Sequence, residues 1–122
     1  MKTYFEFLAG CAALSLPVPE QEVQFAKEQG RKWRTDYLFT FEDGAQIAVE
    51  IEGGVWSKGR HIRPQGFIED MHKYNCYAML GIPILRFTSD QATKQPIWCA
   101  RMIKSTYEKQ PIKELFKIIQ KT

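Results

Sequence analysis

Paired cysteines, long apolar runs and low-complexity segments are all missing from this 122-residue chain. The three cysteines, Cys11, Cys76 and Cys99, are odd in number and show no CxxC spacing, which predicts reduced thiols rather than a disulfide framework. No apolar run reaches the ~18–20 residues of a membrane span. The stretch 5–16 lacks the basic start and the cleavage site of a signal peptide. We therefore expect a cytoplasmic protein with no membrane partner.

The length and composition predict one ordinary domain, residues 1–122. The chain is too short for a TIM barrel or for a separate full-sized cofactor domain. Its 44% hydrophobic and 25% charged residues exclude disorder as the main state. The net charge of +3 is concentrated after residue 100, where six Lys or Arg residues face two acids. Such a basic end fits a polyanion partner, although a solvated helix face is the simpler explanation.

Hydrophobic periodicity and turn residues divide the chain into alternating helices and strands. In chain order we predict a helix over 4–14, strands over 23–26, 32–41 and 46–52, a helix over 65–80, a strand over 82–87, and basic helices over 95–107 and 112–120. Glu42-Asp43-Gly44 marks a hairpin turn. If strand 82–87 pairs in parallel with an earlier strand, helix 65–80 is a crossover. The predicted class is α/β, a mixed β-sheet flanked by helices.

The hairpin 32–52 carries a group of acidic residues. Alternation places Glu50 and Glu52 on one face of their strand, about 6–7 Å apart, and puts Asp36 opposite the apolar face of the preceding strand. If pairing brings Asp36 beside them, the three carboxylates repel one another unless a cation joins them. Such oxygen ligands suit Mg²⁺ or Mn²⁺. Acids on the solvent face of an antiparallel hairpin are the alternative explanation.

Basic residues flank these acids on both sides. Before Asp36 the chain has Arg31, Lys32 and Arg34; after Gly53-Gly54 it has Lys58, Arg60, His61 and Arg63. A flexible basic loop suits phosphate, and carboxylates bracketed by cations are what a metal-dependent enzyme needs to act on a polyanion.

Helix 65–80 has an apolar stripe at helical spacing, which consists of Phe67, Met71, Tyr74 and Ala78. We predict that this stripe and Cys76 pack in the core. His61, His72 and Cys76 make an incomplete zinc set, because a structural zinc usually takes four ligands. Trp33 is assigned to the core.

Several short motifs occur in a characteristic order between about residues 17 and 88. They are Arg34-Thr35-Asp36-Tyr37, Val49-Glu50-Ile51-Glu52-Gly53-Gly54-Val55-Trp56, Gly59-Arg60-His61, Gln65-Gly66-Phe67, Asp70, Lys73-Tyr74-Asn75 and Leu85-Arg86-Phe87-Thr88. Together they resemble small phage and bacterial nucleases of the PD-(D/E)XK superfamily, near the Vsr-like and DUF559-type branches. More distantly they resemble VRR-NUC nucleases and Holliday-junction resolvases. The resemblance implies a restriction-endonuclease-like core.

The resemblance also implies roles for the acids. Asp36 matches the first acid of the superfamily motif and Glu50 the second, both as metal ligands, with the backbone carbonyl of Ile51 as a further ligand. Glu52 stands where the superfamily commonly has lysine. Either Glu52 is a general base or binds a second metal, or the positive charge comes from Lys58, Arg60 or His61, or catalysis is weak.

Other matches to the superfamily pattern are weaker. Glu6 matches an acid that many relatives carry on the first helix, although Glu20 and Glu22 compete for this role. His61 would contact the scissile phosphate or serve as acid or base, unless it is an ordinary loop histidine. The residues expected to bind nucleic acid are Arg34, Trp56, Lys58, Arg60, Arg63 and Gln65. For Gln65, capping of the helix is the alternative role, and for Trp56, a core position.

The sequence is compatible with three functions. The leading one is a Mg²⁺- or Mn²⁺-dependent endonuclease, encoded by a phage or bacterium, that hydrolyses DNA phosphodiesters, with branched or nicked DNA as substrate and a homodimer as a plausible active form. The second is a catalytically weak or inactive nucleic-acid-binding module of the same fold, favoured by Glu52 in place of lysine. The third is a glycoside hydrolase that uses Glu50 and Glu52; it ranks last because the two side chains would point in parallel and would not flank a bond.

Overall fold

The computed structural model describes residues 2–53 and 64–120 and has the predicted class, α/β with a mixed sheet. Its elements are α1 (Phe5–Ala13), β1 (Glu20–Val23), a 3-10 turn (Lys27–Gln29), β2 (Thr35–Thr40), β3 (Gln46–Glu52), α2 (Pro64–Met79), β4 (Ile84–Thr88), α3 (Ser89–Lys94), α4 (Pro96–Glu108) and α5 (Lys113–Gln120). Within the described residues, no helix has both the length and the apolar character needed to cross a membrane.

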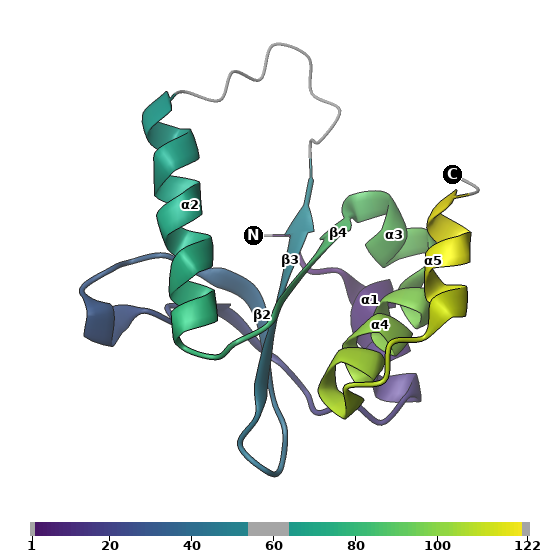
Figure 1. The fold of residues 1–122 in the computed structure, drawn as a ribbon. Coiled ribbons are helices and arrows are strands. Elements are labelled where there is room, and N and C mark those ends of the chain that lie inside the picture. Colours follow the sequence, from purple (N-terminus) through teal and green to yellow (C-terminus); the bar gives the residue numbers. More distant parts are fainter. Residues whose placement is uncertain (1, 54–63, 121–122) are drawn as a thin grey trace.

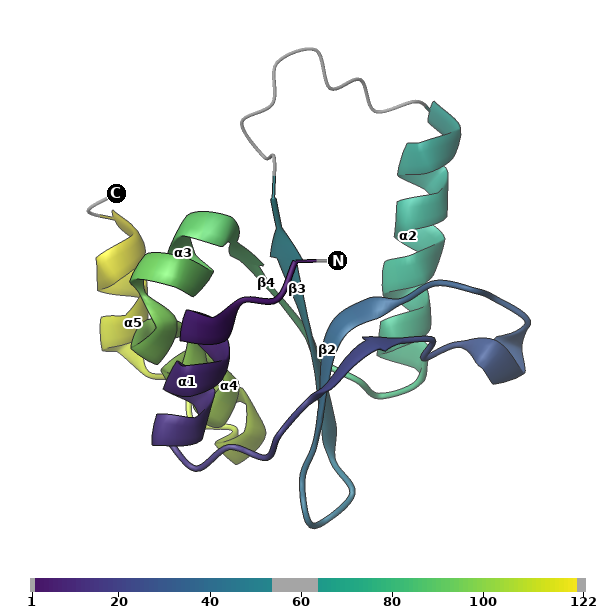
Figure 2. The same ribbon diagram turned by 180° about the vertical axis from the view of Figure 1, so that it is seen from behind.

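The four strands form one sheet in the order β1-β2-β3-β4. The pairs β1–β2 and β2–β3 are antiparallel, whereas β4 lies parallel to β3. The hairpin register sets Tyr37 opposite Val49, and the parallel register sets Glu50 beside Arg86. Because β3 and β4 are parallel, α2 is the predicted crossover between them, visible from both sides in Figures 1 and 2.

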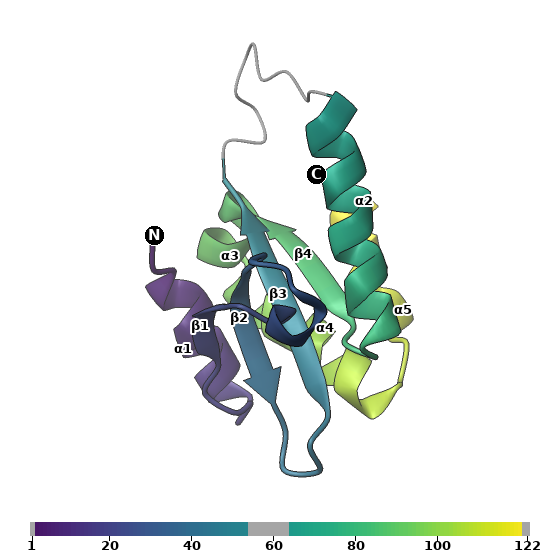
Figure 3. The same cartoon turned by 90° about the vertical axis from the view of Figure 1, so that its left-hand side faces the viewer.

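Helices cover both faces of the sheet. Helices α1, α3, α4 and α5 lie on one face and α2 lies alone on the other (Figures 1 and 3). The larger core, on the first face, includes Phe7, Tyr37, Phe39, Ile47, Val49, Phe87, Trp98 and Ile103; the smaller core, on the α2 face, consists of Leu38, Ala48, Tyr77 and Ile82. Alternation from Leu38 and Ala48 therefore places Asp36 and Glu50 on the α2 face.

Three element predictions need correction. The strand predicted over 23–26 lies at Glu20–Val23, where mostly exposed side chains leave no alternation to detect. The strand predicted over 32–41 is confined to Thr35–Thr40. Helix α3 was missed, because six residues are too few to show a helical period; a capping box between Thr88 and Gln91 fixes its start instead.

The buried side of α2 also differs from the prediction. Phe67 and Met71 are 52% and 48% exposed and Ala78 is also exposed, so most of the stripe assigned to the core faces outward. Tyr74 is the exception, because it is partly buried against the smaller core. The side that meets the sheet carries Cys76 and Tyr77, and Tyr77 stacks on Phe25 with ring centroids 3.9 Å apart. The physical reason lies in the sheet, whose α2 face presents the carboxylate of Glu50 as well as apolar groups. A polar patch selects the helix side that has donors, not the most apolar side.

Candidate functional site

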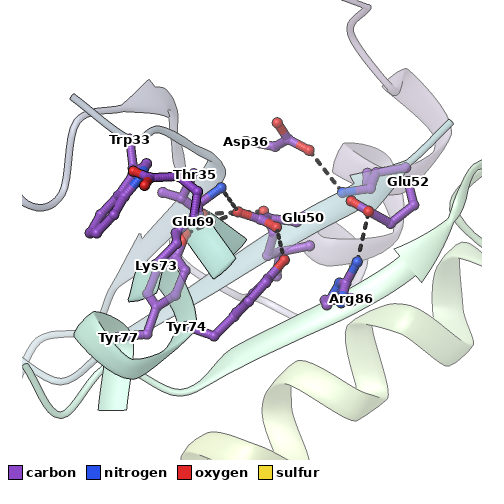
Figure 4. A network of polar contacts seen from close by, with 12 residues as sticks. Trp33, Thr35, Asp36, Glu50, Glu52, Glu69, Lys73, Tyr74, Tyr77 and Arg86 are labelled. Carbon is purple, nitrogen blue, oxygen red and sulfur yellow. Dashed lines mark hydrogen bonds and ion pairs between the residues drawn. The ribbon is translucent and has the colours of Figure 1, made fainter. Parts of the chain in front are cut away.

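Two acids from neighbouring strands meet on the α2 face of the sheet (Figure 4). Asp36 comes from β2 and Glu50 from β3. The Ile51 backbone N–H donates a hydrogen bond of 2.8 Å to Asp36 Oδ2, which fixes the Asp36 carboxylate beside the Ile51 peptide group. The hairpin thus brings together Asp36, Glu50 and the Ile51 backbone, as the alternation of the two strands suggested.

Glu50 is the most deeply buried acid of this group, at 5% exposure, and α2 supplies its partners. Its Oε1 accepts a hydrogen bond of 2.6 Å from the Tyr74 hydroxyl. Its Oε2 accepts one of 3.1 Å from the Tyr77 hydroxyl and lies 2.5 Å from Lys73 Nζ. A buried carboxylate is stable only when it is paired and hydrogen-bonded, and these three groups meet that need.

The two tyrosines act as permanent donors to this carboxylate. Burial, followed by the hydrogen bond and the charge of Glu50, raises the pKa of Tyr74 well above its ordinary value. Burial also raises the pKa of Tyr77, although a hydrogen bond with Thr35 acts in the opposite direction. Both hydroxyls therefore remain protonated at neutral pH.

Asp36 is less well compensated than Glu50. Burial is the largest cause that raises the pKa of Asp36, and the negative charges of Glu50 and Glu52 raise it further. The Ile51 N–H and the Lys73 ammonium lower it without cancelling these effects. The Asp36 carboxylate is therefore a group whose charged form an additional cation would stabilise.

Glu52 has a different partner. Arg86 on β4 places Nη2 2.8 Å from Glu52 Oε1, and the Arg86 guanidinium lies 5.0 Å from the centre of the Tyr74 ring. Figure 4 shows Tyr74 directed to Glu50 and Arg86 directed to Glu52. Each glutamate on this face of β3 is thus held by a cation from another element, Lys73 for Glu50 and Arg86 for Glu52.

The donors of this patch fit a magnesium-like ion better than zinc. Asp36, Glu50 and the Ile51 carbonyl would offer oxygen atoms, and Mg²⁺ needs only one or two protein carboxylates because it keeps water and substrate ligands. Among residues 2–53 and 64–120, no group of three or more His, Cys, Asp or Glu side chains is arranged to hold a metal. The Lys73 ammonium already neutralises Glu50, so an ion at this carboxylate would have to share it with Lys73 or displace Lys73.

The remaining predicted site residues do not gather at this patch or fall outside the described ranges. Glu6 is exposed on α1, Gln65 is exposed in the first turn of α2, and Arg34 is exposed and lies 3.5 Å from Glu22. No hydrogen bond or ion pair within the described parts of the chain joins these three to Asp36 or Glu50. The predictions for Trp56, Lys58, Arg60, His61 and Arg63 lie outside the described residues.

Two further predictions concern aromatic and zinc-binding residues. Trp33, assigned to the core, is only half-buried; it stacks on Phe25, and its Nε1 donates a hydrogen bond of 3.0 Å to Glu69. In the incomplete zinc set, His72 is exposed and Cys76 is buried, and His61 lies outside the described residues.

The structure adds Lys73, Tyr74, Tyr77 and Arg86 to the site. Lys73, Tyr74 and Arg86 belong to motifs of the nuclease resemblance, but none of the four was predicted as a site residue. A signal for the helical residues was present. Lys73 and Tyr77 are four residues apart and Tyr74 is adjacent, so one side of a helix carries a cation and two hydroxyls. Arg86 lies in one of those motifs, but no local pattern predicts its place beside Glu50, because that place depends on the parallel register of β4.

Comparison with protein-family models, with curated proteins and with solved structures found no match to this chain.

Proposed function

We propose that this chain is a divalent-metal-dependent endonuclease with a restriction-endonuclease-like core, which hydrolyses phosphodiester bonds of branched or nicked DNA. The observation that carries the proposal is the meeting of Asp36 and Glu50 from adjacent strands, beside Lys73 of α2. Two carboxylates that repel each other, with a cation fixed beside them, do not by themselves favour the folded state. A site that binds a metal ion and a phosphate group explains why such an arrangement is present.

Each residue of the patch has a defined part in this proposal. Asp36, Glu50 and the carbonyl of Ile51 would hold Mg²⁺ or Mn²⁺. A bound ion of this kind lowers the pKa of water and neutralises charge on a phosphodiester under attack. Tyr74 and Tyr77 keep Glu50 oriented through its two oxygen atoms. Burial of Glu50 and Tyr77 limits the water that competes for the Glu50 carboxylate.

Lys73 provides a positive charge in place of the lysine that the resemblance expects at position 52. The resemblance places a lysine two residues after the second acid, and this chain has glutamate there. Lys73 brings an ammonium group to the same carboxylate from α2 instead. In our proposal Lys73 supplies the positive charge that stabilises the phosphate under attack, and Glu52 orients Arg86 toward the same side.

A specific observation favours the second candidate, a non-catalytic nucleic-acid-binding module. Both oxygen atoms of Glu50 already have partners in the chain, and one of those partners is a cation. A network so well satisfied is stable without a metal ion, as expected if turnover has been lost.

Cleavage of labelled DNA distinguishes the two candidates. Single-stranded, duplex, nicked, flap and four-way-junction substrates are incubated with Mg²⁺, with Mn²⁺ or with EDTA, using wild type, Asp36→Asn and Glu50→Gln. The nuclease requires cutting that depends on metal and disappears in both variants. The control is Asp43→Asn, because Asp43 also accepts a backbone N–H but lies exposed at the hairpin turn. Binding to DNA without any cutting would support the non-catalytic module.

A further inference from the structure

A groove runs beside the carboxylate patch, between α2 and the edge strand β4. Its volume is about 440 Å³, and it is lined by Phe67, Asp70, Met71, Tyr74 and Asn75 of α2 and by Arg86 of β4. All six residues belong to the described part of the chain. Phe67 and Met71, which were wrongly assigned to the core, therefore line a surface groove together with Tyr74.

The groove has apolar walls that the fold itself does not use. Phe67 and Met71 keep about half of their surface exposed, at 52% and 48%. Exposed apolar groups gathered at one place usually mark a contact with another molecule. The volume lies near the lower end of the range for small-ligand sites.

The polar residues of the groove favour a flat ligand with hydrogen-bonding edges. Asp70 offers acceptors and Asn75 offers both a donor and acceptors, and both side chains are exposed at the groove. Arg86 adds a planar cation that already stacks over the Tyr74 ring. Aromatic, thioether and guanidinium groups around amide and carboxylate edges are suited to a nucleobase.

Tyr74 connects the groove to the carboxylate patch. Its ring lines the groove, while its hydroxyl donates a hydrogen bond of 2.6 Å to Glu50. A phosphate held at Asp36 and Glu50 would thus lie within the length of one tyrosine side chain from the groove. A neighbouring nucleotide of the same strand reaches across this distance.

From this geometry we infer that the groove binds an unpaired nucleobase of the strand whose phosphate lies at Asp36 and Glu50. The inference rests on the proposed function and specifies its substrate class. A base inside a duplex has both faces covered by its neighbours, so only a single-stranded or extruded base can enter. The favoured substrates are therefore single strands, flaps and junctions with unpaired bases, rather than continuous duplex.

Binding without cleavage tests this inference separately from the proposed function. Fluorescence anisotropy is measured in EDTA with a short fluorescein-labelled single strand and with the same strand in a duplex. We expect tighter binding of the single strand. In Phe67→Ala, single-strand binding should be roughly five- to a hundredfold weaker, the cost of losing one stacking platform. The dependence on salt should stay unchanged, because no charge is removed.

Ile68→Ala is the matched control, because Ile68 is 49% exposed on the same turn but does not line the groove. Equal losses in both variants, or no loss in Phe67→Ala, would overturn the inference. Dimeric wild type that Phe67→Ala converts to monomers would also overturn it, because the groove would then be a subunit interface. Cleavage that is active in wild type and unchanged in Phe67→Ala would reject the groove but leave the nuclease standing. Loss of binding in Phe67→Ala, without any cleavage by wild type, would support the groove as a binding site and reject the nuclease.

Discussion

At the scale of single residues, the behaviour of the patch depends on how each of its charges is balanced. Glu50 is buried with an ammonium and two hydroxyls as partners, whereas Asp36 is half-buried with one backbone N–H and two repelling neighbours. The two acids therefore respond differently to substitution and to pH. Lys73 contacts Glu50, so a substitution of Lys73 tests Glu50. Ile51 contacts Asp36 through its backbone N–H, so Asp36 is tested by substitution of Asp36 itself.

Removal of the Lys73 charge should destabilise the protein. Lys73→Met leaves the Glu50 carboxylate, whose side chain is only 6% exposed, without its cation. Breaking such a buried pair costs about 3 kcal/mol. Urea unfolding measures this loss, and the double variant Lys73→Met/Glu50→Gln should recover most of it.

Mg²⁺ or Mn²⁺ should stabilise Lys73→Met more than wild type, because the ion takes the place of the missing ammonium group. If the ions stabilise both proteins equally, this would argue against a cation site at Glu50.

Asp36 should make the protein less stable as the pH rises. Because the pKa of Asp36 is raised in the folded state, mainly by burial, the folded state binds more protons than the unfolded state between the ordinary and the raised value. Stability contributed by this group is therefore lost as the pH rises through that window. Asp36→Asn should unfold at higher urea concentration than wild type at neutral pH, in EDTA.

The advantage of Asp36→Asn should disappear below the ordinary pKa of aspartate, where both proteins carry a neutral group at position 36. Asp43→Asn, at an exposed carboxylate that also caps a backbone N–H, should show no comparable gain. An Asp36→Asn protein less stable than wild type at neutral pH would contradict the assignment of Asp36 as a strained acid.

At the scale of elements, the orientation of α2 determines which of its side chains contact the sheet and which line the groove. The helix docks through Tyr77, which is fully buried and stacked on Phe25, while Met71 faces the groove. Tyr77→Ala should therefore cost about 3–5 kcal/mol of stability. Met71→Ala should change stability by no more than about 0.5 kcal/mol. Thermal or urea unfolding of the two variants measures this contrast, and similar losses would mean that both sides of α2 are packed.

The packing of α1 against α4 makes a second contrast. A Cβ on Gly10 would lie 2.8 Å from the Pro96 carbonyl oxygen at the start of α4, a backbone atom that cannot move away. Gly10→Ala should destabilise the protein by about 1–3 kcal/mol. A Cβ on Gly66 in α2 meets nothing within 4 Å, so Gly66→Ala should stabilise by about 0.5 kcal/mol. Calorimetric unfolding tests both signs, and stabilisation by Gly10→Ala would disprove the close approach.

How far the sequence predicts these elements depends on the type of signal. Strand β3 was predicted with its observed bounds, because Gln46–Glu52 alternates between a turn and a pair of glycines. The orientation of α2 was not predictable from its own apolar pattern. The side of a helix that is buried depends on what the opposing sheet face offers, and here that face offers Glu50. Local alternation predicted the strand faces of Asp36 and Glu50, and helical spacing places Lys73 and Tyr77 on one side of α2. The contacts of Lys73 with Glu50 and of Arg86 with Glu52 depend on tertiary structure.

At the scale of the whole molecule, the two faces of the sheet differ in what they bury. The face covered by α1, α3 and α4 holds the larger apolar core, and the α2 face holds a smaller core together with the polar patch. The motifs of the nuclease resemblance end near residue 88, yet Trp98, Cys99 and Ile103 complete the larger core. The segment with the motifs is therefore not a self-contained folding unit.

Truncation tests this dependence. A chain that ends after Thr88 loses the α4 side chains that cover the sheet, so we expect it to be unfolded, with no cooperative thermal transition by circular dichroism. Truncation after Pro111 removes α5 and Leu115, whose carbonyl accepts a 2.7 Å hydrogen bond from Trp98 Nε1. The protein that ends after Pro111 should be folded but less stable than the full chain. A cooperative transition in the chain that ends at Thr88 would contradict the shared core.

Whether Asp36 and Glu50 together form a divalent-cation site is measured by a titration with Mn²⁺ followed by electron paramagnetic resonance. It is made with wild type, Asp36→Asn and Asp43→Asn, each with and without a single-stranded oligonucleotide. We expect Mn²⁺ to bind to wild type and to Asp43→Asn, with higher affinity when the oligonucleotide is present, and not to bind to Asp36→Asn. Mn²⁺ binding that is equal in all three proteins, or absent from all of them even with the oligonucleotide, would contradict a cation site at Asp36 and Glu50.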